Sequence, residues 1–269
     1  FHHLFREALL ERLRATTDAD DVCRAQRRAS DWCACHGLLD EALQYALACG
    51  DPVRAAVLVE ENITTLVNAE DRQRLERWLS WLPPDLLTQR LGLLMAQVWL
   101  NRFQGRYIRN VALLGRVEQL LSDEPWAVDR RAVDLVRGQV QAVRAEIAYL
   151  ENGPAEALER GEEALARLPR EELLARGVAE TYVLGGLQAL GRQDEVARRL
   201  ILSNYREQLD AYTSRVAIAD ILSTMVAAAW DRCEEAARWL LEAAQRKGDF
   251  LIGLAWAHYG LGGVSLERN

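Results

Sequence analysis

The fold of this chain is decided by residues 37–56, whose sequence is GLLDEALQYALACGDPVRAA. Gly37 and Gly50 stand where the ends of helices need a left-handed backbone, and Pro52 suits the first position of a helix. The apolar residues between the glycines recur at helical spacing, and the alanines let one helix approach the next. The segment therefore predicts short amphipathic helices joined by tight turns.

Helical signals continue beyond this segment. Asp40 and Asp51 are candidate N-caps, because a short carboxylate can accept hydrogen bonds from the first free backbone N–H groups of a helix. An apolar stripe around Trp78 predicts a helix, and we expect Trp78 to anchor the core of the hairpin that this helix forms. Pro83-Pro84 ends this helix, and the next begins near Asp85. No stretch shows the alternation typical of strands, so we expect an all-α fold.

Three segments in the second half each predict the start of the second helix of a hairpin: Pro154-Ala155-Glu156-Ala157-Leu158, Asp194-Glu195-Val196-Ala197 and Cys233-Glu234-Glu235-Ala236-Ala237. Ala157, Ala197 and Ala236 are separated by 40 and then 39 residues. Gly185 precedes Ala197 by twelve residues, the spacing of the two small packing positions in tetratricopeptide (TPR) repeats. The sequence therefore predicts a right-handed superhelix of TPR-like helix-turn-helix repeats, an α-solenoid. Phe250–Trp256 predicts the first helix of a further pair.

The composition excludes several function classes. The 269 residues are 50% hydrophobic and carry a net charge of -7, with 40 acidic and 33 basic residues interspersed. Such a surface predicts no direct contact with nucleic acid. Five cysteines in a chain of this size fit a reducing cytosol, and no apolar run approaches the roughly 20 residues that cross a bilayer. We expect a cytoplasmic protein that does not contact a membrane.

Metal binding is considered because Cys23, Cys33, Cys35, His36 and Cys49 lie close together in the sequence. Zinc ligands usually come in pairs separated by two to four residues. On a helix, Cys33 and Cys35 would point to different sides, which favours packing, with Cys33 in the core. We expect no metal site.

Catalytic motifs are missing from the sequence. Adjacent His2 and His3 would diverge by about 100° on a helix, which favours a packing role, and His258 is isolated. The sequence has no G-x-S-x-G motif and no G-x-x-x-x-G-K-[ST] phosphate loop. We interpret three acidic pairs as charges near helix N-termini: Glu162-Glu163, Glu171-Glu172 and Glu234-Glu235. The chain is therefore not expected to be an enzyme.

A ligand groove is the remaining candidate site. Aligning the repeats places the first helix of each pair on the concave face of the superhelix. The groove positions are then Gln139, Glu146, Tyr149, Tyr182, Ile221 and Met225. Aromatic rings with a few polar groups suit a sugar or another small amphipathic ligand. Ordinary packing between repeats is the alternative for each of these side chains.

The order of motifs along residues 1–84 resembles a known family. Phe1-His2-His3-Leu4-Phe5, Ala29-Ser30-Asp31-Trp32 and the two glycine turns are similar to the junction of the MalT-like, large ATP-binding LuxR-type transcription regulators. The resemblance is generic after residue 84. It implies that residues 1–84 are helical hairpins that link a winged-helix arm to a sensor, and that residues 85–269 are the sensor superhelix. One continuous solenoid is the alternative.

This resemblance implies a ligand-gated transcription activator. An inducer, for which a sugar is a candidate, or a regulatory protein would bind the superhelix. The effect would pass to ATPase and helix-turn-helix domains outside this chain, and the protein would self-associate on its promoter. ATP is expected only in an upstream domain, so this chain would hold no cofactor. A TPR-type scaffold for protein interactions is the alternative, and an enzyme accessory domain is a third.

Overall fold

The computed structural model describes residues 8, 12, 18–123, 130–247 and 251–268. The helix expected at Phe1–Phe5, with His2 and His3, lies outside the described residues. Across the described ranges the regular structure is helical and contains no strand, so the expectation of an all-α fold is confirmed. Within the same ranges, no helix combines the length and the apolar character that a membrane span requires.

Contacts between Cα atoms divide the chain into two compact units, each described by itself. Unit 1 comprises Phe1–Leu66 and Asp71–Leu113, and unit 2 comprises Val67–Glu70 and Leu114–Asn269. The boundary expected at residue 84 lies inside unit 1. Unit 1 contains α2 (Ala19–Cys35), α3 (Leu39–Ala48), most of α4 (Pro52–Asn68), α5 (Arg72–Trp81), α6 (Pro84–Gln89), α7 (Leu91–Phe103) and the start of α8 (Tyr107–Asp123).

The turns of unit 1 follow the local sequence closely. Gly37 and Gly50 have φ angles of 74° and 76°, the left-handed backbone that their positions after helices predict. Pro52 opens α4, and the Asp51 carboxylate accepts a hydrogen bond of 3.0 Å from the backbone N–H of Arg54. The predicted N-cap at Asp51 is therefore confirmed.

The predicted N-cap at Asp40 is wrong. The N-cap of α3 is Leu38, and Asp40 lies in the first helical turn. Its carboxylate is held by side chains of α5 instead. It accepts hydrogen bonds from the indole Nε1 of the fully buried Trp78 and from Arg74 and Arg77, at 3.1 and 3.0 Å for the two arginines. Burial alone would raise the pKa of Asp40, but the hydrogen bonds from Trp78 and Arg74 outweigh it and lower that pKa.

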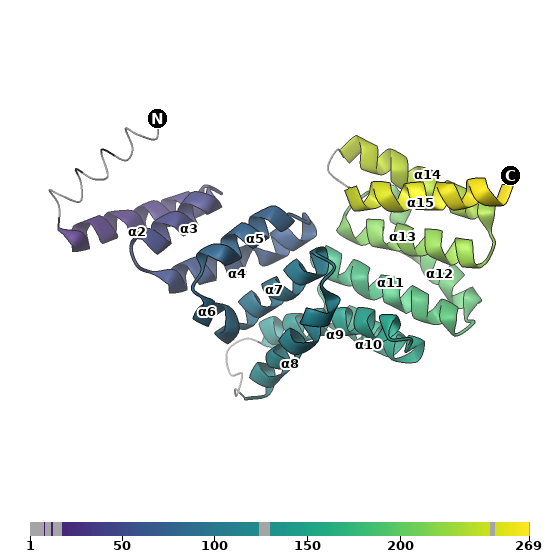
Figure 1. Ribbon diagram of the computed structural model, residues 1–269, viewed down its shortest axis with the longest axis horizontal. Coiled ribbons are helices and arrows are strands. Elements are labelled where there is room, and N and C mark those ends of the chain that lie inside the picture. The colour runs from purple at the N-terminus through teal and green to yellow at the C-terminus, as the bar shows by residue number, and fades with distance from the viewer. Residues whose placement is uncertain (1–7, 9–11, 13–17, 124–129, 248–250, 269) are drawn as a thin grey trace. The chain divides into compact units, whose positions relative to one another are not determined.

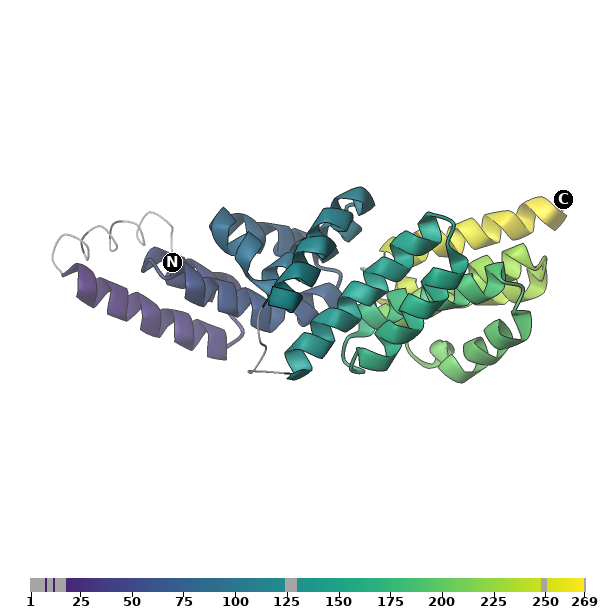
Figure 2. The ribbon, with the colours of Figure 1, turned by 90° about the horizontal axis from the view of Figure 1, so that it is seen from below.

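Unit 2 is built from helix pairs. Its helices are the remainder of α8, then α9 (Arg130–Leu150), α10 (Pro154–Arg167), α11 (Leu173–Ala189), α12 (Gln193–Ser203), the short 3-10 helix η1 (Tyr205–Glu207), α13 (Ala211–Val226), α14 (Trp230–Lys247) and α15 (Leu251–Arg268). The predicted starts of two second helices are confirmed, because α10 begins at Pro154 and α12 at Gln193, one residue before Asp194. The third, α14, begins at Trp230, three residues before the predicted start at Cys233. As can be followed in Figures 1 and 2, α10 packs against both α9 and α11, and α14 packs against both α13 and α15. The first helices α9, α11, α13 and α15 also contact one another in order. The right-handed superhelix stays a prediction.

Two glycines set the distance between α10 and α11. A Cβ atom at Gly186 would lie 2.7 Å from the backbone carbonyl oxygen of Pro154. A Cβ atom at Gly161 would lie 2.6 Å from Cγ2 of Val183. Ala157, the first repeat-marking alanine, is fully buried on α10. The two helices therefore approach so closely that side chains larger than hydrogen do not fit at either glycine.

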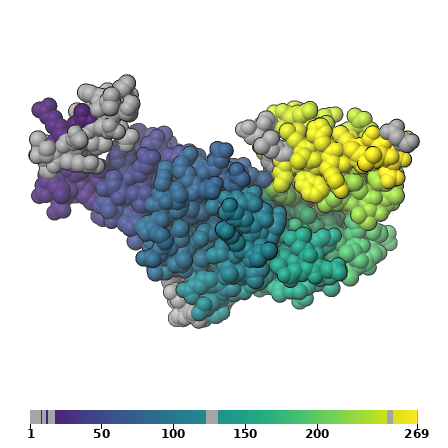
Figure 3. All heavy atoms as spheres, in the orientation of Figure 1, coloured from purple at the N-terminus to yellow at the C-terminus, as the bar shows by residue number. Residues whose placement is uncertain are grey.

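The outer side of α15 is apolar and exposed. Figure 3 shows this helix in yellow at the surface of unit 2. Tyr259 is 57% exposed and Leu266 is 82% exposed. Ile252, about two helical turns before Tyr259, lies on the same stripe. A Cβ atom added at Gly262 on this side would meet no atom within 4 Å.

We expect Gly186→Ala to destabilise the chain by about 1–3 kcal/mol, because the new methyl group must displace the Pro154 backbone. Gly262→Ala is the matched control. It adds the same methyl group to an exposed helix position and should stabilise by up to about 1 kcal/mol. Urea denaturation of both variants measures the difference. Equal stability of the two variants would contradict the close packing of α10 on α11.

We expect Asp40→Asn to lower the free energy of unfolding at pH 7 by about 1–3 kcal/mol, since charged hydrogen bonds to Trp78 and two arginines are lost. The lowered pKa means that the Asp40 contribution is present above the unfolded-state value of about 3.9 and disappears as the pH falls through the folded-state value. Denaturation at several pH values checks this loss. Asp31→Asn, which removes a more exposed carboxylate paired with Arg54, is the control and should have a smaller effect.

Candidate functional site

The predicted groove residues on α9 make polar contacts with the following repeat. The buried Glu146 carboxylate accepts a hydrogen bond of 2.8 Å from the hydroxyl of Tyr182 on α11. The buried Gln139 side chain donates a hydrogen bond of 2.8 Å to Glu172, directly before α11. One contact joins α9 to α11 and the other joins α9 to the N-cap residue of α11, so these polar groups help to align the two helices.

Tyr149 and Tyr182 form an aromatic pair beside Glu146. Their ring centroids lie 5.6 Å apart, with the ring planes tilted by 51°. Gly185 leaves the space for this pair, because a Cβ atom there would lie 3.0 Å from the Tyr149 ring. The structure therefore brings together three of the predicted residues, and Tyr149 is the most exposed of them.

The remaining groove predictions have different surroundings. Met225, at the end of α13, packs so closely on α15 that a Cβ atom at Gly263 would lie 2.7 Å from its Cε. Ile221 is fully buried in the core of unit 2, so its placement on the groove surface is wrong. It faces the core because it packs against Gly260 of α15. Ligand binding by Gln139, Glu146, Tyr149, Tyr182 and Met225 stays a prediction.

The cysteines and the acidic pairs are also placed by the structure. Cys33 is buried in the core and Cys35 is exposed, so the two thiols point to different sides as predicted. Among the described residues, no three His, Cys, Asp or Glu side chains are grouped so that they could hold a metal ion. Glu171-Glu172 directly precedes α11, as predicted.

Two of the acidic pairs do not lie at helix N-termini. Glu162-Glu163 lies in the interior of α10, and Glu234-Glu235 lies beyond the first turn of α14, so both placements are wrong. These carboxylates are placed by ion pairs instead. Glu162 pairs with Arg199, and Glu234 pairs with Arg238 at 2.6 Å.

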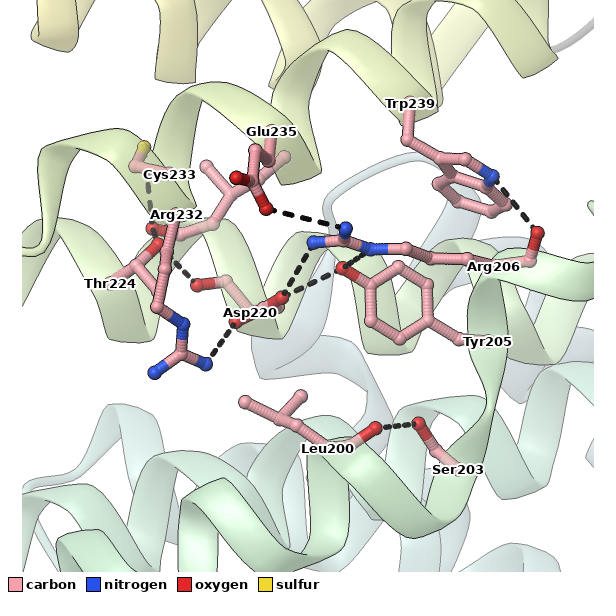
Figure 4. Close-up of polar contacts among 11 residues, drawn as sticks. Leu200, Ser203, Tyr205, Arg206, Asp220, Thr224, Arg232, Cys233, Glu235 and Trp239 are labelled. Carbon is pink, nitrogen blue, oxygen red and sulfur yellow. Dashed lines mark hydrogen bonds and ion pairs between the residues drawn. The ribbon is translucent and has the colours of Figure 1, made fainter.

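A pocket of about 230 Å³ lies among α12, η1, α13 and α14. Its lining combines an apolar wall with charged groups: Leu200, Ile201, Asn204, Tyr205, Arg206, Asp220 and Arg232. Figure 4 shows how Tyr205, Arg206 and Arg232 converge on Asp220. None of the residues predicted from the sequence lines this pocket.

The chain after α12 positions the phenol of the pocket. Asn204 ends α12 in a left-handed conformation, with φ of 46°, and thereby turns the chain into η1. The Tyr205 ring then packs edge-on against Trp239 of α14, at a centroid distance of 5.2 Å. The indole Nε1 of Trp239 donates a hydrogen bond of 3.1 Å to the backbone carbonyl of Arg206. These contacts fix the Tyr205 hydroxyl beside α13.

Asp220 supplies the buried charge of the pocket from the middle of α13. It is 3% exposed, and its Oδ2 accepts a hydrogen bond of 2.7 Å from the Tyr205 hydroxyl. Guanidinium nitrogens of Arg206 and Arg232 lie 3.9 Å from Oδ2 and 3.7 Å from Oδ1. These two distances are too long for hydrogen bonds. Among the described residues, Oδ1 has no hydrogen-bond partner.

Burial dominates the electrostatics of this site. It raises the pKa of Asp220, and the Tyr205 hydrogen bond and the charges of Arg232 and Arg206 offset only part of that rise. Burial and the neighbouring Asp220 carboxylate also raise the pKa of Tyr205, which therefore stays a neutral donor. At the rim, Glu235 lies 3.6 Å from Arg206. The site thus offers two cationic donors, one buried anionic acceptor and an apolar wall, a combination suited to binding.

We expect Asp220→Asn to gain stability relative to the unmodified chain as the pH rises from about 4 to 7. A raised carboxyl pKa means that the folded state holds its proton more tightly. The stabilising contribution is therefore present below the unfolded-state pKa and lost as the pH rises through the folded-state value. Urea denaturation across this range measures the difference. Asp194→Asn, on the exposed side of α12, controls for the loss of one charge, and parallel pH curves for the chain and Asp220→Asn would contradict the prediction.

Comparison of the sequence with known proteins identifies several related proteins. The chain is 30% identical over 209 residues to the HTH-type transcriptional regulator MalT of Yersinia enterocolitica, covering 78% of this chain and 22% of the relative. MalT of Serratia proteamaculans is 31% identical over 209 residues, again covering 78% of this chain and 22% of the relative. The serine/threonine-protein kinase PknK of Mycobacterium tuberculosis is 32% identical over 174 residues, covering 63% of this chain and 16% of the kinase.

The chain spans about a fifth of the length of these relatives. No family model matches the chain, and no solved structure matches it. The two MalT alignments nevertheless cover more than three quarters of its residues. By this similarity the chain is a relative of the MalT-type transcriptional regulators.

Proposed function

We propose that this chain is the sensor region of a MalT-like, LuxR-type transcriptional regulator. It binds an inducer and passes the effect to ATP-binding and DNA-binding parts outside the chain, and its own helices bind rather than catalyse. The similarity to two MalT regulators over most of the chain supports this proposal. PknK, which is named as a kinase, shares a similar segment. A segment shared by proteins with different named activities fits a sensing role better than a catalytic one.

The Asp220 pocket is the observation that carries the proposal. A buried polar atom without a hydrogen-bond partner costs about 1–3 kcal/mol, and Asp220 Oδ1 is such an atom at the wall of a pocket. A ligand that donates a hydrogen bond to Oδ1 removes this cost, and the free energy regained favours binding of such a ligand. The volume of about 230 Å³ fits a small metabolite rather than a segment of another protein.

The helix that carries Asp220 also provides a route for the signal. Arg215, one and a half turns earlier on α13, is buried and donates a hydrogen bond of 2.8 Å to Glu70. Next to this pair, Asn68 accepts a hydrogen bond of 3.0 Å from the backbone N–H of Leu174 on α11. Val67–Glu70 follow directly from the part of α4 that belongs to unit 1. A ligand that shifts α13 therefore acts on the covalent link between the units.

The wider arrangement follows from the same proposal. The paired helices of unit 2 form a right-handed, TPR-like superhelix, and its first helices provide the sensing surface in a cytoplasmic protein. ATP is bound outside this chain, which needs no cofactor of its own. Tyr149 and Tyr182 offer a second surface that a sugar or a peptide could occupy.

A protein-interaction scaffold is the second candidate function. The apolar stripe on α15, with Ile252, Tyr259 and Leu266 exposed, favours this alternative because such a stripe suits a regulatory protein or a second copy of the chain. In this case the stripe, and not the Asp220 pocket, would be the working surface.

Thermal unfolding of the chain with a metabolite library separates the two functions. A sensor is stabilised by RT ln(1+[L]/Kd), about 2.7 kcal/mol at a hundredfold excess over Kd, which raises the Tm by several degrees. Tyr259→Ser and Leu266→Ser should leave this shift unchanged, because they alter only the α15 stripe. If no compound raises the Tm, and a captured protein partner is lost with the two serine variants, the chain is a scaffold instead.

A further inference from the structure

The Asp220 pocket has a charge pattern that selects among small ligands. Arg206 and Arg232 stand at its rim with side chains 43% and 56% exposed, whereas the Asp220 carboxylate lies at its base. Neither guanidinium is within hydrogen-bonding distance of Asp220. Arg206 donates from Nε to the Tyr205 hydroxyl at 3.1 Å, and its terminal N–H groups, like those of Arg232, can turn toward a ligand. The pocket therefore presents cationic donors above an anionic acceptor.

The charges of the pocket balance. Glu235 lies 3.6 Å from Arg206, so two arginines face two carboxylates. A phosphate dianion would be repelled by Asp220 and Glu235, and a simple amine would be repelled by both guanidinium groups. A ligand with one positive and one negative group, placed close together, matches the pattern without excess charge.

The wall of the pocket adds the third feature of the ligand. Leu200 and Ile201 of α12 contribute an apolar surface, and Ile201 is largely exposed. The volume of about 230 Å³ is below the roughly 300–1,000 Å³ of pockets for drug-sized ligands. A molecule with a short aliphatic group fits this space and removes the apolar wall from water.

We propose that this pocket binds a free α-amino acid with an aliphatic side chain. Its ammonium donates to Asp220 Oδ1, its carboxylate accepts from Arg232 and Arg206, and its side chain lies on Leu200 and Ile201. Arg232 covers Oδ1 at 3.7 Å and turns outward on its exposed side chain as the ligand carboxylate enters. The amino acid is then the inducer of the proposed sensor, so the biological meaning of this site rests on the proposed function.

Calorimetry and thermal unfolding of the whole chain test the ligand class. L-leucine, L-isoleucine, L-valine and L-methionine are the probes, and at least one should bind and raise the Tm. Isoamylamine lacks the carboxylate of leucine, and 4-methylpentanoate lacks its ammonium. Each should bind about tenfold or more weakly than leucine, because one charged hydrogen-bonding group is left unpaired.

Variants of the chain test the residues. Asp220→Asn and Arg232→Gln should each weaken binding by about tenfold or more. Arg238→Gln is the matched control on the same helix, since Arg238 pairs with Glu234 and does not line the pocket, and it should change affinity less than about twofold. If Asp220→Asn does not fold, Arg232→Gln alone carries the test, because that side chain lies at the rim.

The possible outcomes separate this inference from the proposed function. No binding of the four amino acids at about 10 mM, or equal binding of leucine and its two analogues, overturns the ligand class. If another compound, such as maltotriose, still raises the Tm, the sensor function stands without this inference. If leucine binds as expected but Glu70→Gln and Arg215→Met leave ligand-induced changes at residues 67–70 intact, the proposed relay fails and the site remains.

Discussion

The close approach of α10 to α11 is the constraint on which unit 2 depends. Gly161 and Gly186 bring the backbones of the two helices into contact, since a Cβ atom at either position would overlap its neighbour. This approach brings α9 beside α11, where the Glu146 carboxylate and the Tyr182 hydroxyl meet. The polar contacts between first helices thus follow from small residues on α10 and α11.

The pocket depends on a second feature, a buried carboxylate, which lowers the stability of the fold. Asp220 places a carboxylate in the core-facing middle of α13, where burial opposes its charge. Tyr205 and two arginines compensate for part of this cost, but Oδ1 keeps no hydrogen bond within the described chain. Hydrophobic residues of similar size would pack this position without that cost. A ligand that completes the hydrogen bonding gives the chain a reason to keep a charge there.

The sequence predicted those features that depend on neighbouring residues. The left-handed turns at Gly37 and Gly50 and the repeated starts of second helices are local, because caps and turns are set within a few residues. The N-cap assignment of Asp40 failed because its carboxylate is taken by Trp78 and two arginines of α5, and Trp78 is 38 residues away in the sequence.

The pocket could not be found by periodicity. Its lining comes from three helices and one short turn, and no spacing pattern connects Tyr205 with Arg232. One signal was present, because Asp220 interrupts the apolar run Ala217-Ile218-Ala219-Asp220-Ile221-Leu222. Glu146, Tyr149 and Tyr182, whose alignment follows the repeat, lie together in the structure. Ile221, which the groove prediction placed on the surface, is buried in a helix that packs on both sides.

Hydrogen–deuterium exchange of the chain, with and without the metabolite that gives the largest rise in Tm, measures directly whether the Asp220 pocket binds the ligand and passes the effect on. We expect new protection at residues 200–206 and 220–235, which surround the pocket, together with a change at residues 67–70. Protection confined to α9 and α11 around Tyr149 and Tyr182, with residues 200–235 unchanged, would contradict it.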